Sequence, residues 1–333
     1  MKTSKALLWT GSQFVAVTAV EIAGLVILSR VLTPQQMGVA AAAYAALRIF
    51  ALMANFGMHP VIVRAPTLDL DLRRQIIGLA VMLSIGSFAV LSTAMTLMPD
   101  AWIAGDLRAV LWVMAPGLLV AGFTMTGSAL LVREQRFPTL FKLRLGATVA
   151  SQGVAVCLAL AGAGPMALAV GYLAGAFAFA LGATVASGGR FLVSPQWRVG
   201  GTLLRAAGAL FALNVVGQAR QATPALLLGP LAGFAAVGQY TRAADLVEQG
   251  TRILREVAFT VLTPKIFEAA RKGADPAQAY LPAATRLATV VWPLALMLSI
   301  LAEPVVGLLL GDQWQAAIAP LSLLALGLLA MPL

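Results

Sequence analysis

The sequence predicts an all-α integral membrane protein, a polytopic helical bundle with about ten membrane-spanning helices. Hydrophobic residues make up 60% of the 333 residues and charged residues only 11%, whereas a soluble domain usually has about 25% charged residues. The apolar residues also fall in runs long enough to cross a bilayer, which takes about 20 residues. These observations leave no sign of a soluble enzyme.

Ten apolar segments reach that length, and the short connections between them predict antiparallel neighbours. They cover residues 6–28, 38–57, 76–98, 107–131, 143–162, 165–186, 200–222, 235–262, 280–302 and 316–333. Lys2 and Lys5 before the first segment resemble the start of a signal peptide, but Glu21 interrupts its apolar core and no small-residue cleavage site follows. We therefore expect the first helix to remain in the protein.

The positive charges predict the orientation of these helices. With the N-terminus in the cytoplasm, 18 of the 23 Lys and Arg residues lie inside and only Arg30 and Arg108 lie outside. Lys and Arg concentrate in the cytoplasmic loops of membrane proteins. The net charge of +10 therefore indicates topology, and we expect no nucleic-acid partner.

The chain is expected to form two lobes, a six-helix lobe over residues 1–190 and the first four helices of a second lobe over 199–333. The longest inside loop, residues 187–199, separates them. A weak repeat agrees, because Leu32, Pro34 and Tyr44 recur 196 positions later in the same order. Two like-oriented lobes are common in transporters. The last segment ends without a polar cap or an inside charge, which predicts a truncated second lobe.

Arg48 is the clearest functional candidate, because a charge in mid-membrane costs about 2.5–3.5 kcal/mol on insertion scales. On a 3.6-residue period it shares one helix face with Tyr44 and Asn55. Two interpretations stay open. The face lines a cavity, or Arg48 forms a structural ion pair with Glu21, whose expected depth differs by only about 5 Å.

Two later segments carry further polar candidates. Asn214, Gln218 and Gln221 share one face of segment 200–222, with Arg220 about a quarter-turn away. Amides between membrane helices are often only interhelical hydrogen bonds, and Arg220 can also extend to the outer interface.

Segment 235–262 carries Arg242 and Asp245 at a helical pairing distance. This pair fits cavity lining and a structural network equally well.

Several common site types are disfavoured. Cys157 is the only cysteine and His59 the only histidine, so an internal disulfide, a cysteine-based metal site and the usual histidine-based catalytic sets are not expected. The sequence also contains no Walker A motif, so ATP hydrolysis is not expected. We therefore expect no enzyme activity, no cofactor and no metal.

Five short motifs together resemble a known family. They are Leu32-Thr33-Pro34 with Gly38, Phe56-Gly57, Arg133-Glu134-Gln135-Arg136-Phe137, Gly229 and Gly233 with Gly238-Gln239-Tyr240-Thr241-Arg242-Ala243, and Gly311-Asp312-Gln313-Trp314. In order and spacing the chain resembles bacterial polysaccharide exporters of the flippase superfamily that includes the multidrug-and-toxin extruders. Gln239 departs from a more usual aromatic residue, and members typically have twelve to fourteen helices.

The resemblance implies a two-lobed bundle in the bacterial cytoplasmic membrane that flips a lipid-linked oligosaccharide from the inner to the outer leaflet. It implies a polyprenyl-diphosphate-linked glycan as cargo, for surface polysaccharides such as lipopolysaccharide or exopolysaccharide. It also allows polysaccharide polymerase and chain-length proteins as partners beside membrane lipid. Arginine suits a diphosphate because its planar fork of donors binds two oxygens at once.

Within this interpretation, Arg48, Tyr44, Asn55, Arg220, Gln218 and Arg242 are the candidate substrate-binding residues, and Glu21 is the candidate for ion coupling. An ion-coupled exporter of drugs or small molecules with the same fold is the alternative. Exporters of cations are expected to use carboxylates in their cavity, and Glu21 is the only acid well inside the first lobe. A non-transporting scaffold and a membrane-embedded glycosyltransferase are weaker alternatives, since no long outer loop exists for the latter.

Overall fold

The computed structural model describes residues 2–65, 68–99, 105–189, 195–197, 200–271 and 276–330, and the regular structure of these residues is entirely helical. This confirms the predicted all-α class. The chain divides into two compact units, Met1–Val237 and Gly238–Leu333. The predicted lobes over 1–190 and 199–333 stay a prediction.

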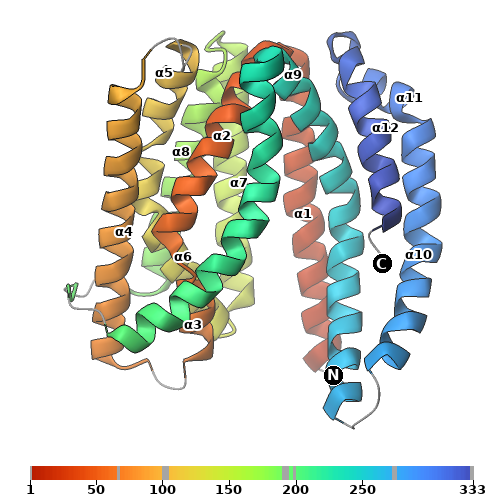
Figure 1. Ribbon diagram of the computed structural model, residues 1–333. Helices are drawn as coiled ribbons and strands as arrows, with labels where there is room; N and C mark the ends of the chain where they lie inside the picture. Colours follow the sequence, from red (N-terminus) through yellow and green to blue (C-terminus); the bar gives the residue numbers. More distant parts are fainter. Residues whose placement is uncertain are drawn as a thin grey trace. The chain divides into compact units, whose positions relative to one another are not determined.

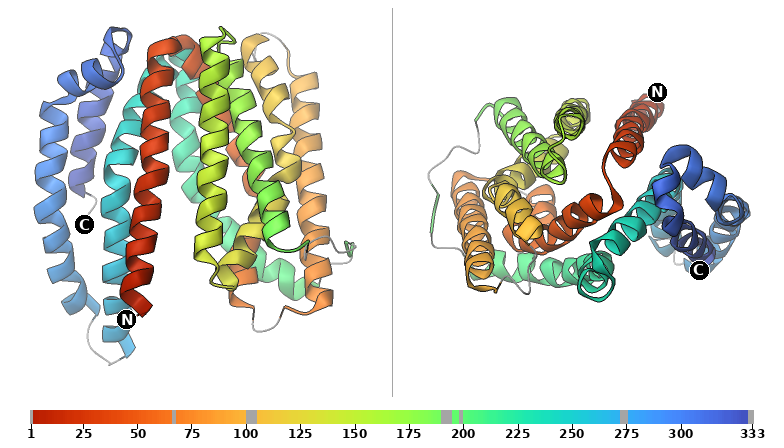
Figure 2. Two further views of the ribbon diagram at one scale, coloured as in Figure 1. Left: turned by 180° about the vertical axis from the view of Figure 1, so that it is seen from behind. Right: turned by 90° about the horizontal axis from the view of Figure 1, so that it is seen from above.

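Among its described residues, the first unit contains eight helices and the first part of a ninth. They are α1 (Lys2–Val31), α2 (Pro34–Asn55), α3 (Met58–Arg64), α4 (Leu70–Leu97), α5 (Gly105–Met114), α6 (Gly117–Arg133), α7 (Phe137–Leu160), α8 (Met166–Ala186) and α9 (Gly201–Arg271). Within the unit, α7 contacts α1 and α8, while α6 contacts α3, α4 and α8. Figure 1 shows these helices side by side, and Figure 2 shows them from behind and from above.

Six helical ranges among the described residues are long and apolar enough to cross a membrane, or up to eight if each of two bent pairs forms one span. The sequence predicted ten. One difference is α1, which is not among these ranges. The other is Leu210–Arg252, a single range that contains parts of two predicted segments, separated by the non-helical backbone of Gly233 (φ 81°, ψ 166°).

The span over Pro34–Arg64 begins with a defined cap and is broken near its other end. Thr33 and Gln36 cap the start of α2 through reciprocal side-chain-to-backbone bonds of 3.3 and 3.0 Å, an arrangement that satisfies free N–H groups at a helix start. Phe56 and Gly57 both have positive φ (35° and 64°). They end α2 and let the chain start again as α3.

Small residues allow α7 and α8 to approach closely. A Cβ atom at Gly171 would lie 2.7 Å from the Ser151 carbonyl oxygen, and one at Gly175 would lie 2.8 Å from the Ser151 Cβ. Glycines four residues apart permit this kind of backbone contact between membrane helices. Helices α7 and α8 therefore pack closely and form one wall of the first unit.

Arg133, the last residue of α6, and Arg136, which directly precedes α7, bond to the ends of other helices. Arg133 donates to the carbonyls of Ile62 (3.0 Å) and Ala65, at the end of α3. Arg136 donates to the carbonyl of Ala186, the last residue of α8, at 2.7 Å. Cations at helix C-termini satisfy free carbonyl groups, so this loop fixes α3 and α8 against α6.

The second unit contains the remainder of α9 with α10 (Pro276–Ile300), α11 (Ala302–Leu309), η1 (Asp312–Ala317), α12 (Ile318–Gly327) and η2 (Leu328–Ala330). Helix α10 contacts α12 and bends by 71° into α11. Gln239 donates to the carbonyl of Gln313 at 2.9 Å, next to the fully buried Trp314. Two of the motifs singled out in the sequence therefore meet within this unit.

Candidate functional site: a polar cavity in the first unit

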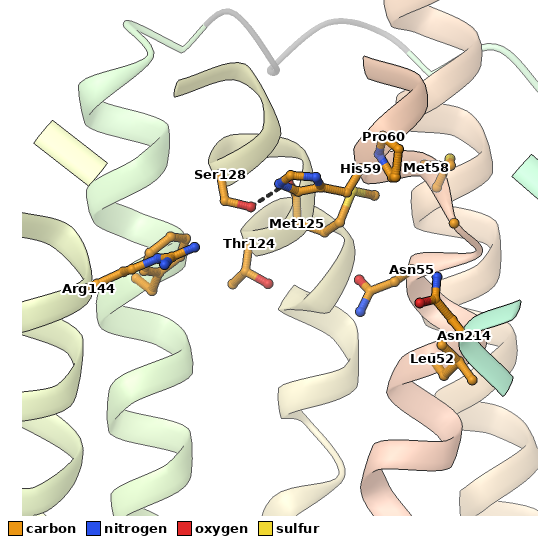
Figure 3. Close-up of a pocket in the computed structure, with 12 residues that line it drawn as sticks. Leu52, Asn55, Met58, His59, Pro60, Thr124, Met125, Ser128, Arg144 and Asn214 are labelled. Atoms are coloured by element: carbon orange, nitrogen blue, oxygen red, sulfur yellow. Dashed lines mark hydrogen bonds between the residues drawn. The ribbon is translucent and has the colours of Figure 1, made fainter. Parts of the chain in front are cut away.

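A cavity of about 430 Å³ lies within the first unit, between α2 and α3, α6, α7, α8 and α9. This volume lies in the range of about 300–1,000 Å³ that is usual for small-molecule sites. Its polar lining residues are Asn55, His59, Thr124, Ser128, Arg144 and Asn214. Figure 3 shows them around one hollow, with Asn55 beside Asn214 and Arg144 on the opposite side.

The break between α2 and α3 positions two of these side chains. Asn55 is the last residue of α2 and His59 the second residue of α3, and both line the cavity. Gly57 between them lies so close to α9 that a Cβ atom there would be 2.5 Å from the Ala207 carbonyl oxygen. The glycine thus lets α9 approach the break. Non-helical backbone at membrane depth is tolerated where it borders a cavity.

Helices α6 and α7 supply the opposite wall. Thr124 and Ser128 are four residues apart on α6, so both hydroxyls lie on one face. The Thr124 hydroxyl donates to the Ala121 carbonyl at 2.7 Å, and the Ser128 hydroxyl donates to the Met125 carbonyl at 2.9 Å. Each hydroxyl hydrogen is therefore used within α6. Figure 3 also shows a hydrogen bond between the Ser128 hydroxyl and the His59 ring, so of the two hydroxyl oxygens that of Thr124 keeps its accepting capacity for the cavity.

The described lining of the cavity includes a cationic side chain and no acidic one. Arg144 contributes a guanidinium from the second turn of α7, and the described lining residues include no Asp or Glu. Nor do the described residues contain any cluster of three or more His, Cys, Asp or Glu side chains that could hold a metal ion. The arrangement favours a ligand that carries negative charge.

Asn55 contributes an acceptor that the protein does not use. Its Oδ1 atom is buried and has no hydrogen-bond partner among the described residues. A buried polar atom without a partner usually costs about 1–3 kcal/mol of stability, and such atoms in native structures call for an explanation.

Arg48 lies two turns before Asn55 on α2, outside the lining of the cavity. Its side chain is exposed, and Nη1 donates to Oε1 of Gln221 on α9 at 3.3 Å. The polar faces predicted for segments 38–57 and 200–222 therefore do meet. In this conformation Arg48 bonds to Gln221 and not to Glu21, so the ion-pair interpretation gains no support.

Tyr44 has structural contacts. Its hydroxyl donates to the Leu168 carbonyl of α8 at 3.3 Å, and its ring meets Tyr172 edge-on with centroids 5.5 Å apart. It also packs against a buried cluster that includes Val39, Leu47 and Leu118. These contacts explain a tyrosine at this position without cargo, and its substrate-binding role stays a prediction.

The remaining candidates are dispersed. Gln218 is half-buried on α9 and Glu21 is half-buried on α1. Arg220 falls in α9, but its side chain lies outside the described part. Arg242 belongs to the second unit, where its Nη1 lies 3.2 Å from Oδ2 of Asp245. That contact confirms the predicted pairing of these two residues.

His59 and Arg144 line the cavity, and neither was among the site residues predicted from the sequence. A lone histidine near a helix end has no pattern to mark it. Arg144 had been counted among the inside charges that set the topology, because it follows Arg133, Arg136 and Lys142 so closely. Only the packing of α7 against the other helices reveals that this arginine borders the cavity.

Comparisons with known proteins identify a family and a similar fold. Residues 27–319 match the family described as "Polysaccharide biosynthesis protein". A solved inward-facing structure of a multidrug resistance MATE family transporter of the MOP superfamily is similar with a TM-score of 0.69. Its sequence identity is 16%, over 95% of this chain and 78% of that chain. No curated protein matches the sequence. The structural likeness confirms the transporter fold predicted from the sequence.

Proposed function

Because the chain belongs to the polysaccharide biosynthesis protein family, we propose that it flips a lipid-linked oligosaccharide across the bacterial cytoplasmic membrane. The family and the fold place it among multi-pass membrane transporters and not among enzymes. The cargo in this proposal is a glycan on a polyprenyl diphosphate, moved from the inner to the outer leaflet for surface polysaccharide such as lipopolysaccharide or exopolysaccharide. Polysaccharide polymerase and chain-length proteins are the proposed partners that act next.

The character of the cavity is the observation that carries this proposal. Arg144 borders it, and no carboxylate is found among its described lining residues. A diphosphate moving through a medium of low dielectric constant needs cationic partners, because an unpaired charge there is strongly disfavoured. A cavity that offers a guanidinium and neutral hydrogen-bonding groups meets this need.

Arg48 is the proposed second contact for the phosphates. It is exposed from α2 and holds only one described hydrogen bond, to the neutral amide of Gln221. Four of its five N–H donors are thus available for a bidentate contact with phosphate oxygens. Arg220 and Arg242 rank behind Arg48, because Arg242 is already paired with Asp245.

Removal of the gene tests the proposal directly. The expected result is loss of surface polysaccharide together with accumulation of its lipid-linked repeat unit inside the cell. Surface polysaccharide at normal levels, or loss without accumulation of the precursor, would contradict a flippase. The complementing gene should restore both measurements.

Arg48 variants test the phosphate contact in the same assay. Arg48→Ala should abolish export, while Arg48→Lys should keep partial export because lysine binds phosphate as a point charge without the fork. Gln221→Ala is the matched control, since it removes the described hydrogen bond and leaves the cation, and it should export normally. If Glu21→Ala restores export to Arg48→Ala, the phosphate role of Arg48 is wrong and the ion pair is its purpose.

Export of a drug or small molecule is the second candidate, favoured by the structural likeness to a multidrug resistance transporter. Cationic drugs would be expected to meet carboxylates, which the described lining of the cavity lacks. Drug susceptibility of the deletion strain separates the two functions. Increased sensitivity to cationic drugs with intact surface polysaccharide would favour this alternative.

A further inference from the structure

His59 gives the cavity a group that can change its charge. It is the only histidine in the chain, and it lines the cavity from the second position of α3. Imidazole is the side chain that ordinarily gains or loses its charge near neutral pH. The ring is half-buried, so it can exchange a proton with solvent.

The bond to Ser128 determines which ring nitrogen can take up a proton. The Ser128 hydroxyl gives its hydrogen to the Met125 carbonyl at 2.9 Å. Its oxygen therefore accepts from the His59 ring in the hydrogen bond of Figure 3. The bonded nitrogen thus carries a hydrogen in both the neutral and the charged ring. Proton uptake takes place at the other nitrogen and leaves this bond intact.

The helices around the cavity supply no carboxylate to balance a charged ring. The sequences of α2, α3, α6, α7, α8 and the part of α9 within the first unit contain no Asp or Glu. Their charged residues are Arg48, Arg64, Arg133, Lys142, Arg144, Arg205 and Arg220. Arg144 lines the cavity and its charge acts on the ring, whereas Arg133 bonds to carbonyls at the far end of α3. A charged ring therefore needs its counter-ion from outside these helices.

We propose that His59 is a proton-binding residue of the cavity, and that a proton on His59 and a phosphate anion bind there together. The anion supplies the counter-charge that the lining helices lack, and the protonated ring adds a cation and an N–H donor for a phosphate oxygen. Each ligand then raises the affinity for the other by the same factor. The proton comes from solvent and returns to it when the anion leaves. The inference rests on the proposed function, because the anion it assigns to the cavity is the diphosphate of the proposed cargo.

A histidine with a purely structural role predicts a different behaviour. Its neutral ring would only join α3 to α6 through the Ser128 hydroxyl. The affinity of the cavity for an anion would then not change with pH in the range where histidine titrates. Replacing the ring by a neutral side chain that also donates to Ser128 would leave anion binding as it is.

Anion binding by the full chain in nanodiscs of a zwitterionic lipid tests the linkage without transport. The probe is diphosphate with one methyl ester on each phosphorus. Its two negative charges are constant across the range of about pH 5–8 in which histidine titrates, so a pH dependence belongs to the protein. The dissociation constant, measured by calorimetric titration, should be about tenfold lower at the acidic end than at the basic end, because the ring then adds a cation beside the anion.

His59→Gln removes the proton site and keeps an N–H donor for Ser128. At every pH it should bind the probe about as weakly as the native chain does at the basic end of the range. Glu303→Gln is the control, because it removes an exposed acid of α11 in the second unit and leaves the cavity unchanged. It should keep the full pH dependence.

NMR of the native chain reports the proton directly and does not depend on how well a variant folds. Because the chain has one histidine, a sample with isotope-labelled histidine gives a single ring signal. At about pH 7, addition of the probe should move this signal toward the chemical shift of the protonated ring. Washing out the probe should reverse the change.

Phospholipid headgroups offer a related anion, a phosphodiester with a single charge. Dimethyl phosphate is the matching probe, and it should bind about tenfold more weakly than the diphosphate ester because it carries half the charge. Equal binding of the two would show that headgroup chemistry is sufficient, and it would overturn the assignment to the cargo.

The inference is overturned if the native chain binds the probe equally at both ends of the pH range, or if the ring signal does not move. A pH dependence that persists in His59→Gln would overturn it as well and would place the proton on another residue. It fails separately from the proposed function. Proton-linked anion binding in a chain whose deletion leaves surface polysaccharide intact would contradict only the flippase. Loss of export on deletion, with anion binding that is independent of pH, would contradict only the role of His59.

Discussion

Gly57 combines two constraints at one residue. Its φ of 64° is in the left-handed region, which residues with a Cβ atom adopt at a cost of about 1–2 kcal/mol. Its Cβ position is also occupied, because the Ala207 carbonyl oxygen would lie 2.5 Å away and the Phe211 nitrogen 2.9 Å away. The break between α2 and α3 and the approach of α9 therefore depend on the same glycine.

Gly57→Ala should destabilise the folded protein by at least about 1–2 kcal/mol, because backbone strain and steric overlap add. The melting temperature of the detergent-solubilised protein measures this. Gly86→Ala on α4 is the matched control, since a Cβ atom there meets nothing within 4 Å and alanine is the better helix former by up to about 1 kcal/mol. Equal melting temperatures for the two variants would show that α9 adjusts freely.

Glu21 is the residue on which coupling to an ion gradient is predicted to depend. It is half-buried on α1, and carboxylates within membranes commonly relay protons or bind cations. Glu21→Gln keeps the shape of the side chain and removes its charge, so it should fold normally and lose gradient-driven export.

Reconstituted vesicles with an imposed gradient measure this loss. Glu303→Gln, an exposed acid on α11, is the control and should export normally. Full activity of Glu21→Gln would leave Glu21 with a structural role only.

At the scale of elements, the contact between α7 and α8 shows how small residues determine which helices pair. Gly171 and Gly175 on α8 contact the backbone and side chain of Ser151 on α7 at distances that exclude a Cβ atom. Between membrane helices the hydrophobic effect gives little drive for association, so close van der Waals packing must supply it. The pair forms the wall that presents Arg144 to the cavity.

Gly171→Leu should therefore push α8 away from α7 and destabilise the protein by about 1–3 kcal/mol or more. Gly153→Leu on α7 is the control, because a Cβ atom at Gly153 meets nothing within 4 Å. The yield of monodisperse protein after solubilisation and its melting temperature distinguish them. Similar values for both variants would contradict the role assigned to this contact.

The motifs that carried the family resemblance are mainly turns and helix ends. Thr33 caps α2, Phe56-Gly57 ends it, Arg133 and Arg136 hold α3 and α8, and Gln239 bonds to Gln313. Each one determines where a helix starts, stops or meets another helix. The resemblance could therefore indicate the fold, while it carried little information about which side chains meet cargo.

For the whole molecule, hydropathy and charge were sufficient for the class of protein and most of the spans. They also separated segments 200–222 and 235–262, and the non-helical backbone of Gly233 lies between these two segments within α9. For the site, periodicity on α2 identified the polar face with Arg48 and Asn55. It could not identify His59 or Arg144, since the cavity is formed by residues from six helices whose mutual packing no local pattern describes.

Orientation in the membrane is the whole-molecule property that the sequence predicts and that labelling can test. Helix α4 presents one exposed residue near each end, Leu70 (52% exposed) and Leu97 (77% exposed). Its 28 residues are about 42 Å long, enough to place these positions on opposite sides of a bilayer. Arg73 and Arg74 lie three and four residues after Leu70, so Leu70 should be cytoplasmic.

Single cysteines at these positions, in a Cys157→Ala background, report the side of the membrane. An impermeant maleimide added to intact cells should label Leu97→Cys and not Leu70→Cys, because only the outer end of α4 is then within reach. After permeabilisation both should react, which shows that the inner position is accessible and not merely buried. Labelling of Leu70→Cys alone in intact cells would contradict the predicted topology and invert it.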